Sequence, residues 1–131
     1  MYMLKFKFAK LVRDAIVDQQ ISSGAKPSYR ILNDTDHKAE LVNKIIEEAR
    51  EITHVDPDEV AAEIADVQQA IDDLKEKYGL TSADIAAAQA VKIAEAGAFK
   101  KGLFVDYVEI DKNNKWLAYY RKNADRYPEI Q

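Results

Sequence analysis

The first residues of the chain alternate between apolar and charged side chains. In the segment MYMLKFKF, apolar side chains recur at every second position, and Lys5 and Lys7 lie between them. A period of two is typical of a β-strand with one buried face. The segment LFVDYVEI, residues 103–110, also has the composition of a strand. We expect these two segments to pair as a small two-stranded sheet.

Between these segments the apolar residues recur at helical spacing. Gly24 and Gly79 stand where a left-handed glycine would end a helix. Asp56 and Pro57 form a helix start, because Asp56 can cap and proline suits the first helical position. Helices are predicted over residues 11–23, 37–53, 57–78 and 81–96, and residues 113–131 are expected to form a short amphipathic helix or an ordered extension.

This pattern predicts a mainly α-helical bundle with one small two-stranded β element. A chain of 131 residues is long enough for one domain with a buried core. We therefore expect residues 1–110 to form the domain and residues 111–131 to be a helical extension of it.

Composition narrows the classes of function. The chain has no cysteine, which excludes disulfides and thiolate metal ligands. No apolar run is long enough to span a membrane, and the alternating N-terminus is a poor signal peptide, so we expect a cytoplasmic protein. With a net charge of −4 and a pI near 5.2, general attraction to nucleic acid is not expected. Lysines at positions 100, 101, 112 and 115 are interpreted as solvated surface.

The carboxylates of residues 47–66 lie close to the apolar faces of two predicted helices. At about 100° per residue, Glu48 falls roughly 20° outside Leu41 on the border of the apolar stripe. On the next helix Glu63 falls inside the apolar face and Asp66 borders it. An ionised carboxylate buried alone costs several kcal/mol, so pairing, protonation or a metal ion is required there.

Each of the two helices carries an acidic pair with a spacing of three residues. Glu48 and Glu51 form one pair, Glu63 and Asp66 the other. Members of such a pair lie on the same side of a helix. If the helices pack antiparallel, the four carboxylates converge into an oxygen-rich cage suited to Mg²⁺ or Mn²⁺. A solvated charged surface explains either pair alone, but both pairs turned toward the apolar side favour the metal site.

A second metal pattern is present and is rejected. Glu51 and His54 form an E-x-x-H pair, the ligand motif of di-iron helical bundles. Those bundles need a second pair, and His37 is preceded by Asp34 in a predicted loop. We interpret His54 as a surface or capping residue at a helix end.

The acidic residues also form a recognisable motif. Glu47-Glu48-x-x-Glu51 followed by Glu63-x-x-Asp66 resembles the E-E-x-x-E…E-x-x-D signature of MazG-like all-α nucleoside triphosphate pyrophosphatases. Three further segments are similar to a subgroup of predicted house-cleaning pyrophosphatases. They are Lys10-Leu-Val-Arg-Asp14, Tyr29-Arg30-Ile-Leu32, and Lys92-x-x-x-x-Gly97-Ala98-Phe99-x-x-Gly102.

The resemblance implies a helical bundle of the all-α pyrophosphatase type that hydrolyses a nucleoside triphosphate to the monophosphate and pyrophosphate. Glu47 and Glu48 become the candidate catalytic residues, with Glu47 as a base or as a hydrogen-bond acceptor that does not touch the metal. The implied metal ligands, for Mg²⁺ or possible Mn²⁺, are Glu48, Glu51, Glu63 and Asp66. The implied phosphate-binding residues are Lys10, Arg13, Arg30 and Lys92. For Arg13 a structural ion pair with Asp14 is the alternative.

The sequence differs from the family pattern in two places. The spacer between Glu51 and Glu63 is short for the superfamily, and Ala98 stands where a second glycine is usual. Relatives form dimers or higher assemblies, which implies a homo-oligomer here, and the tail after Asp111 could be a lid or an oligomer contact.

The alternative functions are a phosphoribosyl-ATP pyrophosphohydrolase and a non-catalytic helical interaction module that retains the metal site. Tyr29 or Phe99 could stack on a base, although core packing is the more common role.

Overall fold

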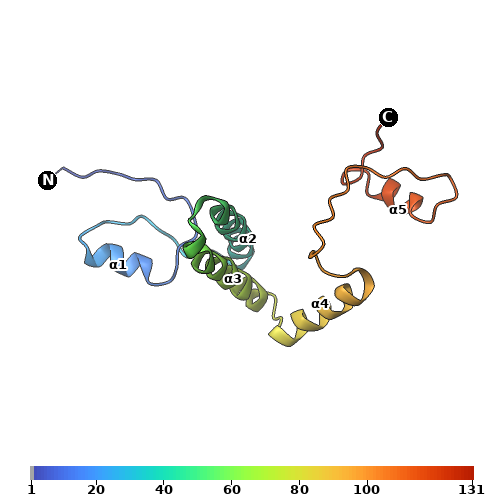
Figure 1. The fold of residues 1–131 in the computed structure, drawn as a ribbon. Coiled ribbons are helices and arrows are strands. Elements are labelled where there is room, and N and C mark those ends of the chain that lie inside the picture. Colours follow the sequence, from blue (N-terminus) through green and yellow to red (C-terminus); the bar gives the residue numbers. More distant parts are fainter. Residues whose placement is uncertain (1) are drawn as a thin grey trace. The chain divides into compact units, whose positions relative to one another are not determined.

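The structure is a computed structural model that describes residues 2–131. Helices dominate it, as predicted, and Figure 1 shows their order along the chain. Clustering of contacts divides the chain into two compact units, the first ending at Val91 and the second running from Lys92 to Gln131. The elements are α1 (Ile16–Ser22), α2 (Asp34–Glu51), η1 (Ile52–His54), η2 (Pro57–Glu59), α3 (Val60–Lys77), α4 (Ser82–Ala96) and α5 (Leu117–Lys122).

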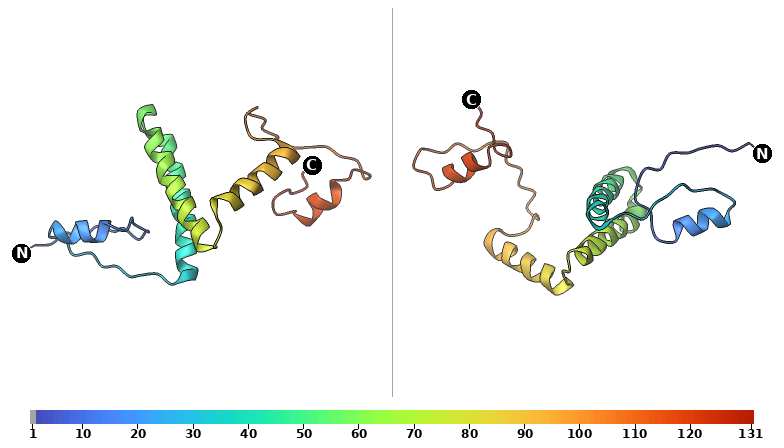
Figure 2. Two further views of the ribbon diagram at one scale, coloured as in Figure 1. Left: turned by 90° about the horizontal axis from the view of Figure 1, so that it is seen from below. Right: turned by 180° about the vertical axis from the view of Figure 1, so that it is seen from behind.

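Helices α2 and α3 form an antiparallel hairpin, which is the centre of the first unit. The two helices lie side by side in each view of the ribbon (Figures 1 and 2). Lys77 at the end of α3 pairs with Asp34 at the start of α2, with 3.2 Å between Nζ and Oδ1. The last turn of α2 therefore lies beside the first turn of α3, which is the packing that the acidic motif required.

The starts of two helices follow from local capping. Helix α2 begins at Asp34, earlier than the predicted His37, because the Asn33 side chain accepts a hydrogen bond from the Asp36 amide at 2.8 Å. The start of α4 is a capping box. The Thr81 amide donates to Asp84 Oδ2 at 2.8 Å, and the Asp84 amide donates to Thr81 Oγ1 at 3.1 Å.

The turn after α3 also agrees with the sequence. Gly79 has a φ of +68°, in the left-handed region that glycine adopts at low cost, and it ends α3 as predicted. The segment that precedes α3 differs from the prediction that Asp56 caps a helix. Asp56 occupies the cap position of η2, but its side chain accepts no capping hydrogen bond there.

The first predicted helix is shorter than expected. Residues 11–23 were predicted to be helical, but α1 covers only Ile16–Ser22. The preceding residues contact the hairpin instead, with Leu11 and Val12 half-buried and Arg13 paired with Asp66 on α3. Tertiary contacts of this segment therefore outweigh its modest local helix propensity.

The predicted two-stranded element is not found. No strand occurs among residues 2–131, and both candidate segments are largely exposed without ladder hydrogen bonds. A strand satisfies its backbone donors and acceptors only through a partner strand. Residues 2–9 belong to the first unit and residues 103–110 to the second. An alternating pattern of apolar and charged side chains does not by itself provide a partner strand.

The hydrophobic core is confined to the seam between α2 and α3. Leu41 is 3% exposed and Ala70 is 5% exposed, and they are the only buried hydrophobic residues within the described chain. Ile64 and Ile71 of α3 are not part of this core, because Ile64 is 52% exposed and Ile71 is also exposed.

Within residues 2–131, no helix is both long enough and apolar enough to cross a membrane.

Leu41 is expected to contribute most to the stability of the hairpin. Leu41→Ala should lower the free energy of unfolding by about 2–3 kcal/mol, because it removes buried methyl groups and leaves a cavity. Urea unfolding followed by circular dichroism measures the change. Ile31→Ala, at a position in the loop before α2 that is 94% exposed, is the control and should cost much less. Equal losses in the two variants would contradict the packing of this seam.

Candidate metal centre

Three carboxylates meet across the hairpin. Glu48 comes from the last part of α2, and Glu63 and Asp66 come from the first two turns of α3. One carboxylate oxygen of each residue lies within 4.8 Å of the others, and all three side chains are half-buried. Three oxygens at this separation can share one hard divalent cation, and no nitrogen or sulfur ligand is among them. The donor set therefore fits a metal such as Mg²⁺ or Mn²⁺.

Glu51, the fourth predicted ligand, is not part of this group. It is exposed near the end of α2, one turn beyond Glu48. Its charge nevertheless contributes to raising the pKa of Glu63. The structure thus brings three of the four predicted ligands together and keeps Glu51 in their electrostatic neighbourhood.

Glu63 experiences the strongest crowding of negative charge. Its pKa is raised above the ordinary value of 4.5, first by desolvation and then by the charges of Asp66 and Glu48, with smaller contributions from Glu51 and Glu59. Nearby like charges disfavour the ionised form of a carboxyl group. A cation placed among these oxygens would remove that penalty.

Lys44 forms ion pairs at the edge of the acidic group. Its Nζ lies 3.2 Å from Glu48 Oε1 and 3.3 Å from Glu47 Oε2. Desolvation acts to raise the pKa of Glu47, but hydrogen bonds from Lys10 and Lys44 lower it below the ordinary value of 4.5. Lys44 was missed by the sequence reasoning. Its position four residues before Glu48 is the signal that could have identified it, because such residues face each other on a helix.

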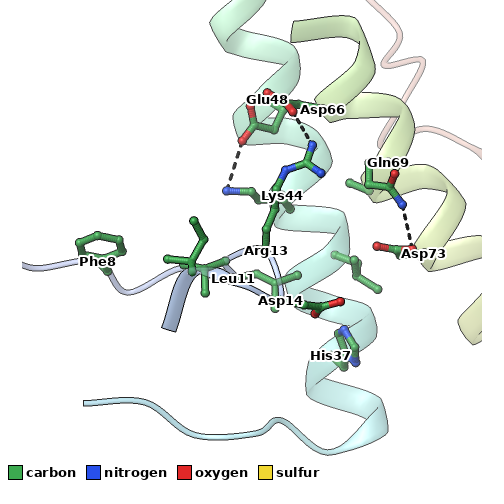
Figure 3. A pocket seen from close by; sticks show the side chains of 14 residues that line it. Phe8, Leu11, Arg13, Asp14, His37, Lys44, Glu48, Asp66, Gln69 and Asp73 are labelled. Atoms are coloured by element: carbon green, nitrogen blue, oxygen red, sulfur yellow. Dashed lines mark hydrogen bonds and ion pairs between the residues drawn. The ribbon is translucent and has the colours of Figure 1, made fainter. Parts of the chain in front are cut away.

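Two of the four predicted phosphate-binding residues form ion pairs with acidic residues of the motif. Lys10 Nζ is 3.1 Å from Glu47 Oε1, and the Arg13 guanidinium is paired with Asp66 (Figure 3). Arg13 therefore pairs with a predicted metal ligand, and its ion pair does not involve Asp14. The segment of residues 10–14 is thus held against both helices of the hairpin by charge.

Arg30, the third predicted cation, is not found at the carboxylates. Arg30 is exposed in the loop before α2 and does not line the cavity beside them. Lys92 is exposed on α4 and belongs to the second unit. Tyr29 and Phe99, the candidate stacking residues, are both exposed and are not core residues. His54 is exposed in η1, in agreement with its interpretation as a surface residue.

An open cavity of about 440 Å³ adjoins the centre. It lies between the hairpin and the segment that leads into α1, and Figure 3 shows Glu48, Asp66, Lys44 and Arg13 grouped together in it. Its lining is mixed. Apolar lining comes from Phe8, Leu11, Val12, Ile16, Leu41 and Ala70, and polar lining from Arg13, Asp14, His37, Lys44, Glu48, Asp66, Gln69 and Asp73.

No protein-family model matches the chain, and comparisons with curated proteins and with solved structures gave no match.

Neutralising Glu63 should stabilise the metal-free protein at neutral pH. Because its pKa is raised in the folded chain, ionisation costs folding free energy once the pH exceeds its unfolded value. Glu63→Gln should therefore raise the urea midpoint at pH 7, and the gain should disappear as the pH falls below about 4, where the wild-type carboxyl is protonated in both states. Urea unfolding in EDTA across this pH range measures the effect.

Glu76→Gln is the matched control, because Glu76 is exposed further along α3 and outside the group of three. It should leave the midpoint nearly unchanged. A gain in Glu63→Gln that persists at acidic pH would contradict the role of charge.

Proposed function

We propose that the protein is a Mg²⁺-dependent nucleoside triphosphate pyrophosphohydrolase of the MazG-like all-α type. The observation that carries the proposal is the convergence of Glu48, Glu63 and Asp66 from two helices on one half-buried point. These residues belong to the E-E-x-x-E…E-x-x-D motif. Lys44 pairs with Glu48 and Arg13 with Asp66, but among residues 2–131 no basic side chain pairs with Glu63. Exposed acidic groups on a merely solvated surface do not need to meet at a helix seam.

In the proposed reaction a water oxygen bonds to the α-phosphorus, and the bond from that phosphorus to the bridging oxygen breaks. The products are the monophosphate and pyrophosphate. When bound, Mg²⁺ would neutralise phosphate charge and activate the water. Glu48, Glu63 and Asp66 would hold it, with Glu51 as an additional or water-mediated ligand. Glu47, whose pKa is lowered, is better suited to hold Lys10 than to accept a proton.

Lys10 and Arg13 would bind the triphosphate. In the chain without substrate they pair with Glu47 and Asp66, which places two cations beside the cavity. A cation bound by Asp66 would compete with Arg13, and an incoming phosphate would offer the freed guanidinium a bidentate partner. Arg30 and Lys92 remain candidate phosphate contacts on the strength of their sequence segments. Non-canonical nucleotides are the proposed substrates, and the proposed location is the cytoplasm.

We also propose that the chain works as a homo-oligomer. Two buried hydrophobic residues are a small core for a chain of this length. Meanwhile Val42 and Ile46 on α2, and Ile64 and Ile71 on α3, are exposed. Apolar helix faces of this kind are commonly covered by a partner, and a second copy of the chain is the simplest one.

Pyrophosphate release should depend on both the metal and the carboxylates. A panel of canonical and modified nucleoside triphosphates is incubated with the protein in Mg²⁺ or in EDTA, and pyrophosphate, phosphate and monophosphate are measured. Activity should disappear in EDTA. It should fall at least about 100-fold in Glu63→Gln and Asp66→Asn, because each loses a ligand charge at the reacting phosphate.

Glu76→Gln should retain wild-type activity in the same assay. Release of single phosphate would place the cleaved bond elsewhere and contradict the proposal. Phosphoribosyl-ATP is added to the panel, and hydrolysis restricted to it would identify a phosphoribosyl-ATP pyrophosphohydrolase. Folded protein that binds Mg²⁺ but hydrolyses none of these compounds would favour the interaction module.

The oligomer should depend on the exposed face of α2. Light scattering after size-exclusion chromatography is expected to give the mass of two or more chains. Ile46→Glu should shift that mass toward one chain, because it places a charge in the proposed contact. Ile31→Glu changes an equally apolar residue in the exposed loop before α2 and should not alter the mass. A wild-type mass of one chain would refute the oligomer without affecting the proposed chemistry.

A further inference from the structure

A basic stretch of sequence lies in the second unit, although the chain as a whole is acidic. Residues 112–127, here called the aromatic–basic segment, contain five basic side chains and one acidic side chain. Their net charge is therefore +4, in a chain whose net charge is −4. The basic residues are Lys112, Lys115, Arg121, Lys122 and Arg126. Among residues 2–131 none of these five forms an ion pair with a carboxylate, so the chain itself does not neutralise the segment.

Four aromatic rings are clustered in the same segment, on and around α5. The rings are those of Trp116, Tyr119, Tyr120 and Tyr127, and the centroids of neighbouring rings lie 5.3–6.1 Å apart. The rings do not only cover one another, because Trp116 is 49% exposed, and Tyr119 and Tyr127 are exposed as well. Exposed aromatic faces are surfaces on which another planar group can stack.

The cations and the rings of the aromatic–basic segment are interleaved. Lys115 Nζ lies over the Trp116 ring, 5.4 Å from its centroid, and the Arg126 guanidinium carbon lies 5.4 Å from the centroid of the Tyr127 ring. Each contact places a positive charge directly beside a stacking surface. A ligand that fits both features carries repeated negative charges and planar rings with accessible faces.

Single-stranded nucleic acid has this chemistry. Every nucleotide carries a phosphate, and its base offers a face for stacking because it is not enclosed in a duplex. Proteins that bind single strands combine basic surface with aromatic rings in this way. An anionic membrane would also attract the cations, but it binds helices through a large apolar face, and α5 has only six residues.

We propose that the aromatic–basic segment binds single-stranded nucleic acid, with Trp116 and Tyr127 stacking on bases and Lys115 and Arg126 contacting phosphates. The inference goes beyond the proposed pyrophosphatase and does not depend on the metal centre. It assigns a role to Lys115, which the sequence analysis interpreted as solvated surface. The net charge of the whole chain conceals this role, because it sums a basic segment with an acidic hairpin.

The test is binding of a thymidine oligonucleotide of about 12 nucleotides, without a terminal phosphate, to the full chain at about 50 mM salt. EDTA is present, so that no divalent metal bridges the strand to the carboxylates of the hairpin. Fluorescence anisotropy of the labelled strand should give a dissociation constant of about 10⁻⁵ M. Trp116 is the only tryptophan of the sequence, so quenching of its fluorescence by the unlabelled strand reports stacking on that ring.

Two double variants separate a local phosphate contact from general charge. Lys115→Gln/Arg126→Gln should weaken binding about 10-fold and lower the slope of log K against log salt by about 1.4, because each phosphate contact to a single strand contributes about 0.7. Lys100→Gln/Lys101→Gln is the matched control. It removes the same charge from the same unit, at two exposed lysines outside the aromatic–basic segment, and should change the affinity by less than about 2-fold.

The stacking role has a different signature. Trp116→Leu should weaken binding about 10-fold but leave the salt slope unchanged, because it removes a stacking surface and no charge. Circular dichroism checks that each variant is folded. If Trp116→Leu does not fold, quenching of Trp116 in the wild type by the strand, and its absence with inorganic triphosphate, measures the same contact.

Several results would overturn the inference. Equal losses in the two double variants would show that binding depends only on overall charge. A duplex of the same length, or polyglutamate, that binds as tightly as the single strand would exclude stacking on bases. Binding to phosphatidylserine vesicles without binding to the strand would identify a membrane surface instead.

The outcome is separable from that of the proposed function. Pyrophosphate release by a chain that does not bind the strand would refute this inference alone. Binding of the strand by a chain that hydrolyses no nucleotide would refute the pyrophosphatase alone.

Discussion

The mutual repulsion of carboxylates at the α2–α3 seam is the constraint on which the rest of the site depends. Glu48, Glu63 and Asp66 are brought within 4.8 Å by the same antiparallel packing that buries Leu41 and Ala70. Packing energy therefore places like charges together, and the raised pKa of Glu63 records part of the cost. Such an arrangement is stable only when positive charge is close by.

The chain supplies some of that positive charge itself. Lys44, Lys10 and Arg13 each pair with an acid of the motif. Exposed ion pairs contribute little to stability, so the significance of these contacts lies in their position. They keep cations beside the cavity, where the proposed reaction needs them for phosphate. Within the described chain, Glu63 has no basic partner.

The small size of the hydrophobic core makes charge repulsion important for the stability of the hairpin. A hairpin with two buried hydrophobic residues has little stability to offset charge repulsion. A bound cation would add stability by mass action, and a second copy of the chain would add it by covering exposed apolar residues such as Ile46 and Ile64. Metal binding, assembly and folding are therefore expected to be coupled in this protein.

Local chemistry was readable from the sequence. The spacing of apolar residues predicted the helices, and Gly79 marked the end of α3. The predicted helix over residues 81–96 matches α4, which begins at the capping box of Thr81 and Asp84. The position of Glu63 and Asp66 near the apolar face predicted that they would approach Glu48. Each of these features depends on residues within a turn or two of one another, or on the face that a helix buries.

The tertiary structure decided the features that depend on distant residues. Residues 11–15 are not helical because they contact the hairpin, and residues 2–9 and 103–110 form no strand because neither has a partner strand. The pairing of Arg13 with Asp66 joins positions 53 residues apart, which no local pattern encodes. The sequence by itself determined which residues could form the centre. Only the packing of α2 against α3 decided which carboxylates meet and which cations neutralise them, because electrostatic energy depends on distance in space.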